Sequence, residues 1–158
     1  MREDSLKVPK ILKEVVLWVH PEGRVVGSLY LRQQSMNHAG QETVLEALNK
    51  KEPFIVFKRS EPNEHRFYNR KSIIRVEYSG REYQVARAIK PLHCQLQLMD
   101  GALFKGTIQE PLHPNQARLL DYLNKKDETF IKLHVDELTV LINKSYIIHV
   151  YVGNLEDK

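Results

Sequence analysis

Apolar and polar positions alternate over short stretches of this chain, a pattern typical of β-strands that place one face against a core. Residues 15–19 are rich in β-branched and aromatic side chains, and a turn at residues 20–23 leads into a returning strand over residues 24–31. The chain is therefore predicted to open with a β-hairpin. The returning strand is expected to turn four positions to one face: Val25, Gly27, Leu29 and Leu31.

The same pattern returns in the second half, which indicates that the chain consists of two internal repeats. Length changes between the copies fall between the shared motifs, as they do when loops absorb insertions in a duplicated fold. Four matched segments are offset by 79, 75, 76 and 74 residues: Gly27-Ser28-Leu29 with Gly106-Thr107-Ile108, Leu48-Asn49-Lys50-Lys51 with Leu123-Asn124-Lys125-Lys126, Phe54-Ile55 with Phe130-Ile131, and residues 69–76 with 143–150.

Each repeat also predicts one helix, over residues 41–48 and 114–123, followed by a left-handed cap at Asn49 or Asn124. The apolar stripes of these helices are Val44, Leu45 and Leu48, and Leu119, Leu120 and Leu123. Two strands and a short last strand then complete each repeat, at residues 54–59, 66–68 and 73–78, and at residues 130–135, 139–142 and 147–152.

Gly27 and Gly106 stand in the middle of strands, where glycine marks a sharp bend or the close approach of another backbone. Strongly bent strands allow a short sheet to curl into a small barrel. The expected fold class is mainly β with α (α+β), with two tandem small β-barrels that each carry one inserted helix. The expected organisation is a lead-in over residues 1–14, a first repeat over 15–78, a connector over 79–92 and a second repeat over 93–158.

A repeat of about 65 residues is marginal as an independent core. We therefore expect the two halves to pack together or to be completed by other chains.

Two short motifs carry a resemblance to a known family. Asp100-Gly101 is followed by Gly106 and Ile108, and residues 141–145 lead through Ile147 to Val150. Both motifs resemble the Sm-like superfamily, which includes bacterial Hfq, and the resemblance implies tandem SH3/Sm-like barrels. It also implies RNA binding at Lys144, Arg70 and Lys71. The chain departs from the family in placing its helix between the second and third strands, and in having Ser145 where Hfq has a histidine.

Composition indicates a soluble folded protein, with 42% hydrophobic and 28% charged residues. No apolar run approaches the roughly 18 residues needed to cross a bilayer, so no membrane association is expected. The first residues form no signal-peptide core, and the single Cys94 can form no intramolecular disulfide. Both observations favour a cytoplasmic location.

The net charge of +4 lies in the first repeat, because residues 1–79 carry 14 Lys/Arg against 10 Asp/Glu and residues 80–158 carry 10 of each. Such a charge is suited to a nucleic acid or an acidic partner, and it is also an ordinary charge for solubility.

Catalytic and metal-binding patterns are not found in the sequence. His93 and Cys94 are adjacent and should point to opposite faces of a strand, and the other histidines have no recognised ligand spacing. Cys94 aligns with the inward Val15, which indicates a buried structural thiol. No nucleophile elbow or phosphate-binding glycine loop is present. We expect a protein with no enzymatic activity, no cofactor and no metal.

Residues 58–71 interleave cations with aromatic side chains, the chemistry that a single nucleic-acid strand requires. The alternative is a solvated hairpin whose aromatic residues cover the core. Two hypotheses remain open, a binding or assembly module whose strand edges pair with a protein partner or with other copies, and a single-stranded RNA-binding protein. The candidate nucleic-acid residues are Lys58, Arg59, Arg66, Phe67, Tyr68, Arg70, Lys71 and Lys144.

Overall fold

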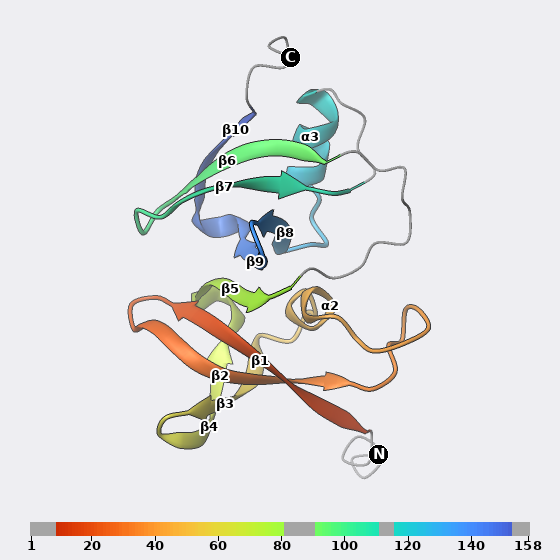
Figure 1. Ribbon diagram of the computed structural model, residues 1–158, viewed down its shortest axis with the longest axis vertical. Helices are drawn as coiled ribbons and strands as arrows, with labels where there is room; N and C mark the ends of the chain where they lie inside the picture. Colours follow the sequence, from red (N-terminus) through yellow and green to blue (C-terminus); the bar gives the residue numbers. More distant parts are fainter. Residues whose placement is uncertain (1–8, 81–90, 111–115, 153–158) are drawn as a thin grey trace. The chain divides into compact units, whose positions relative to one another are not determined.

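The computed structural model describes residues 9–80, 91–110 and 116–152, which are mainly β-strand with few helices (Figure 1). The chain divides into two compact units, Met1–Ile73 (unit 1) and Ile74–Lys158 (unit 2). Along unit 1 lie β1 (Lys10–Val19), β2 (Gly23–Arg32), α2 (Val44–Leu48), β3 (Phe54–Ser60), β4 (Asn63–Asn69) and the 3-10 helix η1 (Arg70–Ser72). Along unit 2 lie β5 (Ile73–Ser79), β6 (Leu92–Leu98), β7 (Leu103–Ile108), α3 (Gln116–Leu123), β8 (Phe130–Val135), β9 (Leu138–Asn143), the 3-10 helix η2 (Lys144–Tyr146) and β10 (Ile147–Val152).

Unit 1 is built on an antiparallel ladder in the order β1-β2-β3-β4. The first hairpin runs from the pair Lys10 and Arg32 to the pair Val19 and Gly23, so β1 begins inside the segment that the sequence assigned to the lead-in. The inward face predicted for the returning strand is confirmed, because the apolar side chains of that face are buried.

Unit 2 contains one strand from the first repeat. Its order is β10-β6-β7-β8-β9-β5, and β5 pairs with β9 from Arg75 opposite Ile142 to Ser79 opposite Leu138. Unit 2 begins at Ile74, and the boundary between the repeats at residues 79–92 stays a prediction from the sequence. Residues 81–90 of that connector lie outside the described residues.

The sheet of unit 2 is open and antiparallel. β10 pairs with β6, and β5 pairs with the outer edge of β9. No ladder in the described residues therefore joins β9 to β10. The two closed barrels expected from the bent strands are therefore not formed by these hydrogen bonds.

The glycines in the middle of β2 and β7 both lie close to the backbone of the neighbouring strand. A Cβ atom on Gly27 would lie 2.2 Å from the carbonyl oxygen of Lys58, and one on Gly106 would lie 2.4 Å from that of His134. Lys58 and His134 occupy equivalent positions in the two repeats, 76 residues apart. The predicted close approach of a second backbone is thus confirmed in both halves.

The helices follow the predicted stripes with two corrections. Val44 and Leu48 are buried in α2, and Leu119 is buried in α3, but Leu120 is exposed. The left-handed cap predicted at Asn49 is wrong, because this residue has a φ of −90°. Its backbone N–H instead continues the helical hydrogen-bond pattern to Leu45.

Glu46 fixes the loop that precedes α2. Its carboxylate accepts hydrogen bonds from Ser35 Oγ at 2.9 Å, Asn37 Nδ2 at 2.8 Å and the Thr43 backbone N–H at 2.9 Å, and it lies 3.0 Å from His38 Nε2. Thr43 Oγ1 in turn accepts from the Glu46 backbone, which completes a capping box.

We expect this cluster to make the protein sensitive to acid. Burial pushes the pKa of Glu46 upward, but the hydrogen bonds from Thr43, Asn37, Ser35 and His38 outweigh burial and lower it to about 2. Because the folded pKa lies below the ordinary value of 4.5, the stabilisation is complete above that pH and is lost as the pH falls toward 2. Urea unfolding between pH 7 and pH 2 should show a smaller loss of stability on acidification in Glu46→Gln than in the wild type. An identical pH profile in the two proteins would contradict this role.

Candidate interaction site

Three of the candidate side chains converge on Glu22, in the turn between β1 and β2. Arg59 Nη1 lies 2.6 Å from Glu22 Oε2, and Arg66 Nη1 lies 3.4 Å from the same oxygen. The Tyr68 hydroxyl donates to Glu22 Oε1 at 3.2 Å and accepts from Arg59 at 3.2 Å. Arg66 also contacts Glu64 at 2.6 Å. Both arginines are therefore paired with carboxylates. Hydrogen bonds to Glu22 and then Tyr68 raise the pKa of Arg59, and hydrogen bonds to Glu64 and then Tyr68 raise the pKa of Arg66.

The two aromatic residues of β4 point to opposite faces of the strand. Tyr68 is buried and packs edge-on against Phe57, with 5.9 Å between the ring centroids. Phe67 is 71% exposed and shares its outer face with Val56, its partner on β3, and with His65. His65 stacks on Tyr30 and shares a 2.7 Å hydrogen bond with its hydroxyl. The outer face of the β3–β4 hairpin thus carries the Phe67 ring and Val56 next to His65 and its strand partner Lys58.

Arg70 and Lys144 occupy equivalent positions, and each caps the helix of its own repeat. The Arg70 guanidinium is buried and donates to the carbonyls of Ala47 at 2.9 Å, Phe54 at 3.3 Å and Glu52. Lys144 Nζ donates to the carbonyls of Leu123 at 3.0 Å and Lys125 at 2.7 Å. These cations satisfy the helix ends where the sequence predicted left-handed asparagine caps.

The remaining candidates are dispersed. Lys58 Nζ donates to Asn63 Oδ1 at 2.8 Å within the β3–β4 hairpin, and Lys71 is exposed on η1. The structure thus brings Arg59, Arg66 and Tyr68 together on Glu22, and it places Phe67 and Lys58 on the outer face of the β3–β4 hairpin.

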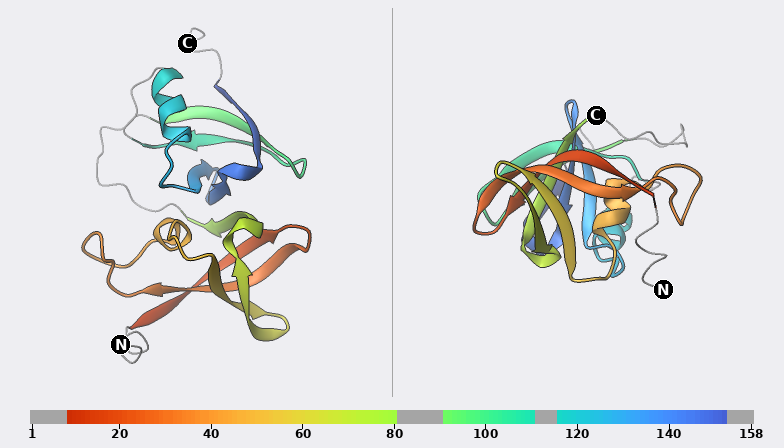
Figure 2. Two further views of the ribbon diagram at one scale, coloured as in Figure 1. Left: turned by 180° about the vertical axis from the view of Figure 1, so that it is seen from behind. Right: turned by 90° about the horizontal axis from the view of Figure 1, so that it is seen from below.

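Among the described residues, β4 ends the ladder of unit 1 and β10 ends the ladder of unit 2. β4 pairs with β3, and β10 pairs with β6 (Figure 2). Their counterparts in the other repeat, β9 and β5, pair with each other. The edges of β4 and β10 therefore present unpaired backbone groups to the surroundings.

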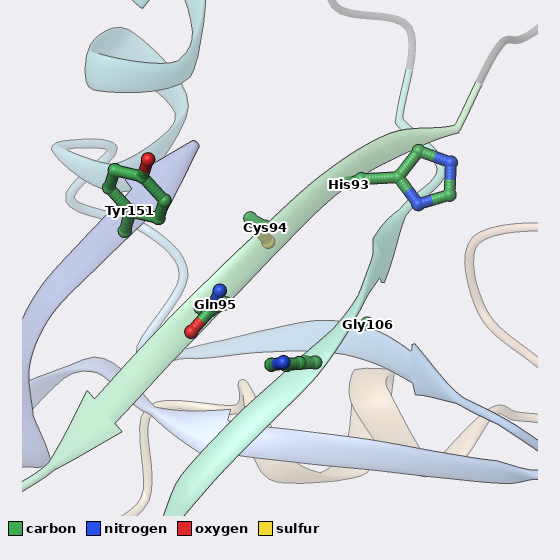
Figure 3. Close-up of a pocket in the computed structure, with 6 residues that line it drawn as sticks. His93, Cys94, Gln95, Gly106 and Tyr151 are labelled. Carbon is green, nitrogen blue, oxygen red and sulfur yellow. The ribbon is translucent and has the colours of Figure 1, made fainter. Parts of the chain in front are cut away.

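A shallow pocket of about 310 Å³ lies on β6, β7 and β10 (Figure 3). Tyr151 on β10 and Gln95 on β6 line it as neighbours in the ladder, together with His93, Lys105 and Gly106. Cys94 also lines the pocket, but burial raises the pKa of its thiol to about 11. The thiol is therefore protonated at neutral pH and is a poor nucleophile.

The sequence reasoning missed Glu22 as the centre of the cluster. One feature of the sequence could have indicated Glu22. An acidic residue precedes the turn glycine in both repeats, as Glu22-Gly23 and Asp100-Gly101. Asp100 plays a similar part in unit 2, where its carboxylate lies 3.3 Å from Arg75.

Across the described segments, no three His, Cys, Asp or Glu side chains gather closely enough to hold a metal ion. The helices that the structure describes are all too short or too polar to cross a bilayer. Comparison with protein-family models, with curated proteins and with solved structures gave no match to this chain.

Proposed function

We propose that this protein is a non-enzymatic assembly module that binds other proteins through the edges of β4 and β10. In this proposal the chain is a tandem duplication of a small Sm-like barrel. The strand order of the second repeat, last-first-second-third-fourth, supports a single five-stranded unit that was copied.

The observation that carries the proposal is the pairing of β5 with β9. Inside this chain, the last strand of one repeat already adds to the fourth strand of the other by backbone hydrogen bonds. β-Strand addition of this kind supplies affinity through the main chain and specificity through alternate side chains. The other fourth strand, β4, and the other last strand, β10, have no second ladder among the described residues.

A second candidate function is binding of single-stranded RNA, and the exposure of Phe67 favours it. An exposed aromatic ring beside cations suits base stacking. The paired state of Arg59 and Arg66, together with the capping roles of Arg70 and Lys144, leaves few of the predicted cations to contact phosphates. Assembly is therefore the better-supported function.

Photo-crosslinking separates the two functions. A benzophenone amino acid at position 67 on β4 or position 151 on β10 should give adducts in cells that protease removes and nuclease leaves intact. Position 12 is the matched control, because Leu12 is an exposed apolar residue on β1, a strand that the proposal does not use. Nuclease-sensitive adducts at position 67 would establish the RNA-binding alternative. Equal labelling at all three positions, or none, would overturn both proposals.

A further inference from the structure

We propose that the shallow pocket on β6, β7 and β10 binds an acidic segment of a partner protein, with a carboxylate held by Lys105 and His93. This surface is one face of a sheet, so the binding goes beyond the function assigned to the strand edges. Its geometry, its charge and its difference from the first repeat all point to a carboxylate ligand.

Strand pairing places the polar side chains of the pocket in one row. Tyr151 on β10 lies opposite Gln95 on β6, and Gln95 lies opposite Lys105 on β7. Residues that face each other across a ladder have Cβ atoms about 5 Å apart. His93 is two residues from Gln95, so alternation along the strand places it on the same face (Figure 3). Four side chains from three strands can therefore reach one ligand segment.

The charge of this face favours an anion. Lys105, His93 and His149 belong to the three strands, and β6, β7 and β10 as the structure describes them contain no Asp or Glu. In the turn between β6 and β7, the Asp100 carboxylate lies 3.3 Å from Arg75 and is already engaged. A carboxylate that enters the pocket would thus meet complementary charge and no competing acid on these strands.

The polar side chains of the pocket have no partner within the described chain. No hydrogen bond or ion pair between described residues involves the side chains of His93, Gln95, Lys105 or Tyr151. Lys144, by contrast, is committed to two carbonyls of its own repeat. Because His93, Lys105 and Tyr151 are exposed, their imidazole, ammonium and phenol groups are available to a ligand.

The first repeat has different chemistry at the equivalent positions. β6 and β7 correspond to β1 and β2 at an offset of 79, and β10 corresponds to β5 at an offset of 74. The counterparts of the four polar residues are two carboxylates and two valines: Glu14, Val16, Val26 and Glu77. Val16 lies opposite Val26, as Gln95 lies opposite Lys105, so the pairing is the same. The strand pairing itself therefore does not require polar residues at this site.

The form of the pocket suits a side chain of a peptide. Its volume of about 310 Å³ is at the lower end for sites that enclose a small organic ligand, and it is shallow. The Gln95 amide can donate to and accept from a peptide backbone, and the Tyr151 ring is 53% exposed and available for contact. A nucleic-acid strand needs several cations along its backbone, and these three strands contain one Lys and no Arg. An acidic peptide is therefore the occupant that this face fits.

NMR spectroscopy of the full chain titrated with acetylated hexaglutamate tests the proposal. The backbone amides of residues 93–95, 105–106 and 151 should shift at low salt, and added salt should weaken the binding. Hexaglutamine with the same blocked ends is the control, because it offers the same backbone without the charge. No shifts at the pocket, equal shifts with hexaglutamine, or shifts concentrated in the first repeat would overturn the proposal.

The first repeat also supplies a variant that should fold. Lys105→Val installs the counterpart residue, and Val26 is tolerated at the equivalent position with 43% exposure. This variant should bind hexaglutamate about fivefold more weakly, at the upper end for an exposed ion pair. Lys126→Val is the matched control, because it removes the same charge from an exposed turn and should bind like the wild type. Equal affinities of the two variants would overturn the role of Lys105.

Two further comparisons identify the ligand class and separate this pocket from the strand edges. If hexauridylate shifts the same amides at lower concentrations than hexaglutamate, the occupant is a nucleic acid and the acidic peptide is wrong. Photo-adducts at position 67 on β4 should persist in Lys105→Val, because β4 is not part of the pocket. A pocket that fails these tests therefore leaves the proposal for the strand edges standing.

Discussion

Replacing Gly27 or Gly106 by alanine should lower the free energy of unfolding by about 3 kcal/mol, at the upper end of overpacking costs. The added Cβ atom would overlap a backbone carbonyl oxygen in both cases, at 2.2 Å from Lys58 or 2.4 Å from His134. At Gly27 it would also lie 2.7 Å from two atoms of the Phe57 ring. A backbone carbonyl in a ladder cannot move aside without breaking its strand pairing, so the strands must separate.

Urea unfolding followed by circular dichroism measures this effect. Ser28→Ala is the matched control, since it changes the next residue of the same strand without adding an atom. If Gly27→Ala or Gly106→Ala unfolds within about 1 kcal/mol of the wild type, the close approach of the strands is not as tight as the geometry indicates.

Replacing Arg70 by methionine should destabilise the protein by about 3 kcal/mol. Three carbonyl groups, of Ala47, Glu52 and Phe54, would lose their donor in a buried site. An unsatisfied buried acceptor costs about 1–3 kcal/mol, and methionine fills the volume of the stem without replacing any hydrogen bond.

The second repeat provides an internal reference for this substitution. Lys144 caps the equivalent helix with an ammonium group that donates to two carbonyls, so Arg70→Lys should recover part of the lost stability. Chemical unfolding of Arg70→Met, Arg70→Lys and the exposed-site control Lys51→Met separates loss of charge from loss of the cap. Equal stability of Arg70→Met and Lys51→Met would show that the cap contributes nothing.

The order and extent of the strands could largely be predicted from the sequence. Alternation of apolar residues reports the local environment of a strand, and the internal similarity of the sequence showed each weak pattern a second time. The strand pattern assigned to residues 130–135 matches β8 to the residue. The helix caps were harder to predict from the sequence, because Arg70 and Lys144 donate to carbonyl groups more than 20 residues earlier in the chain.

The pairing of β5 with β9 could not be predicted, because alternation shows that a strand has a buried face but not which strand lies beside it. The same limit applied to the basic and aromatic segment. Its composition indicated cations next to rings, but only the three-dimensional arrangement shows that Arg59 and Arg66 both contact Glu22 and that Tyr68 and Phe67 face opposite ways.

The pairing of β5 with β9 also determines how this chain can be divided into fragments for study. A truncation that ends after Ser79 would keep β5 but remove the β9 ladder that covers it, and a fragment that begins at Leu92 would expose the outer edge of β9. The fragment that preserves the hydrogen bonds of unit 2 has to begin before β5, at the end of η1. Fragments cut by sequence similarity alone would therefore expose unpaired strand edges, which promote aggregation.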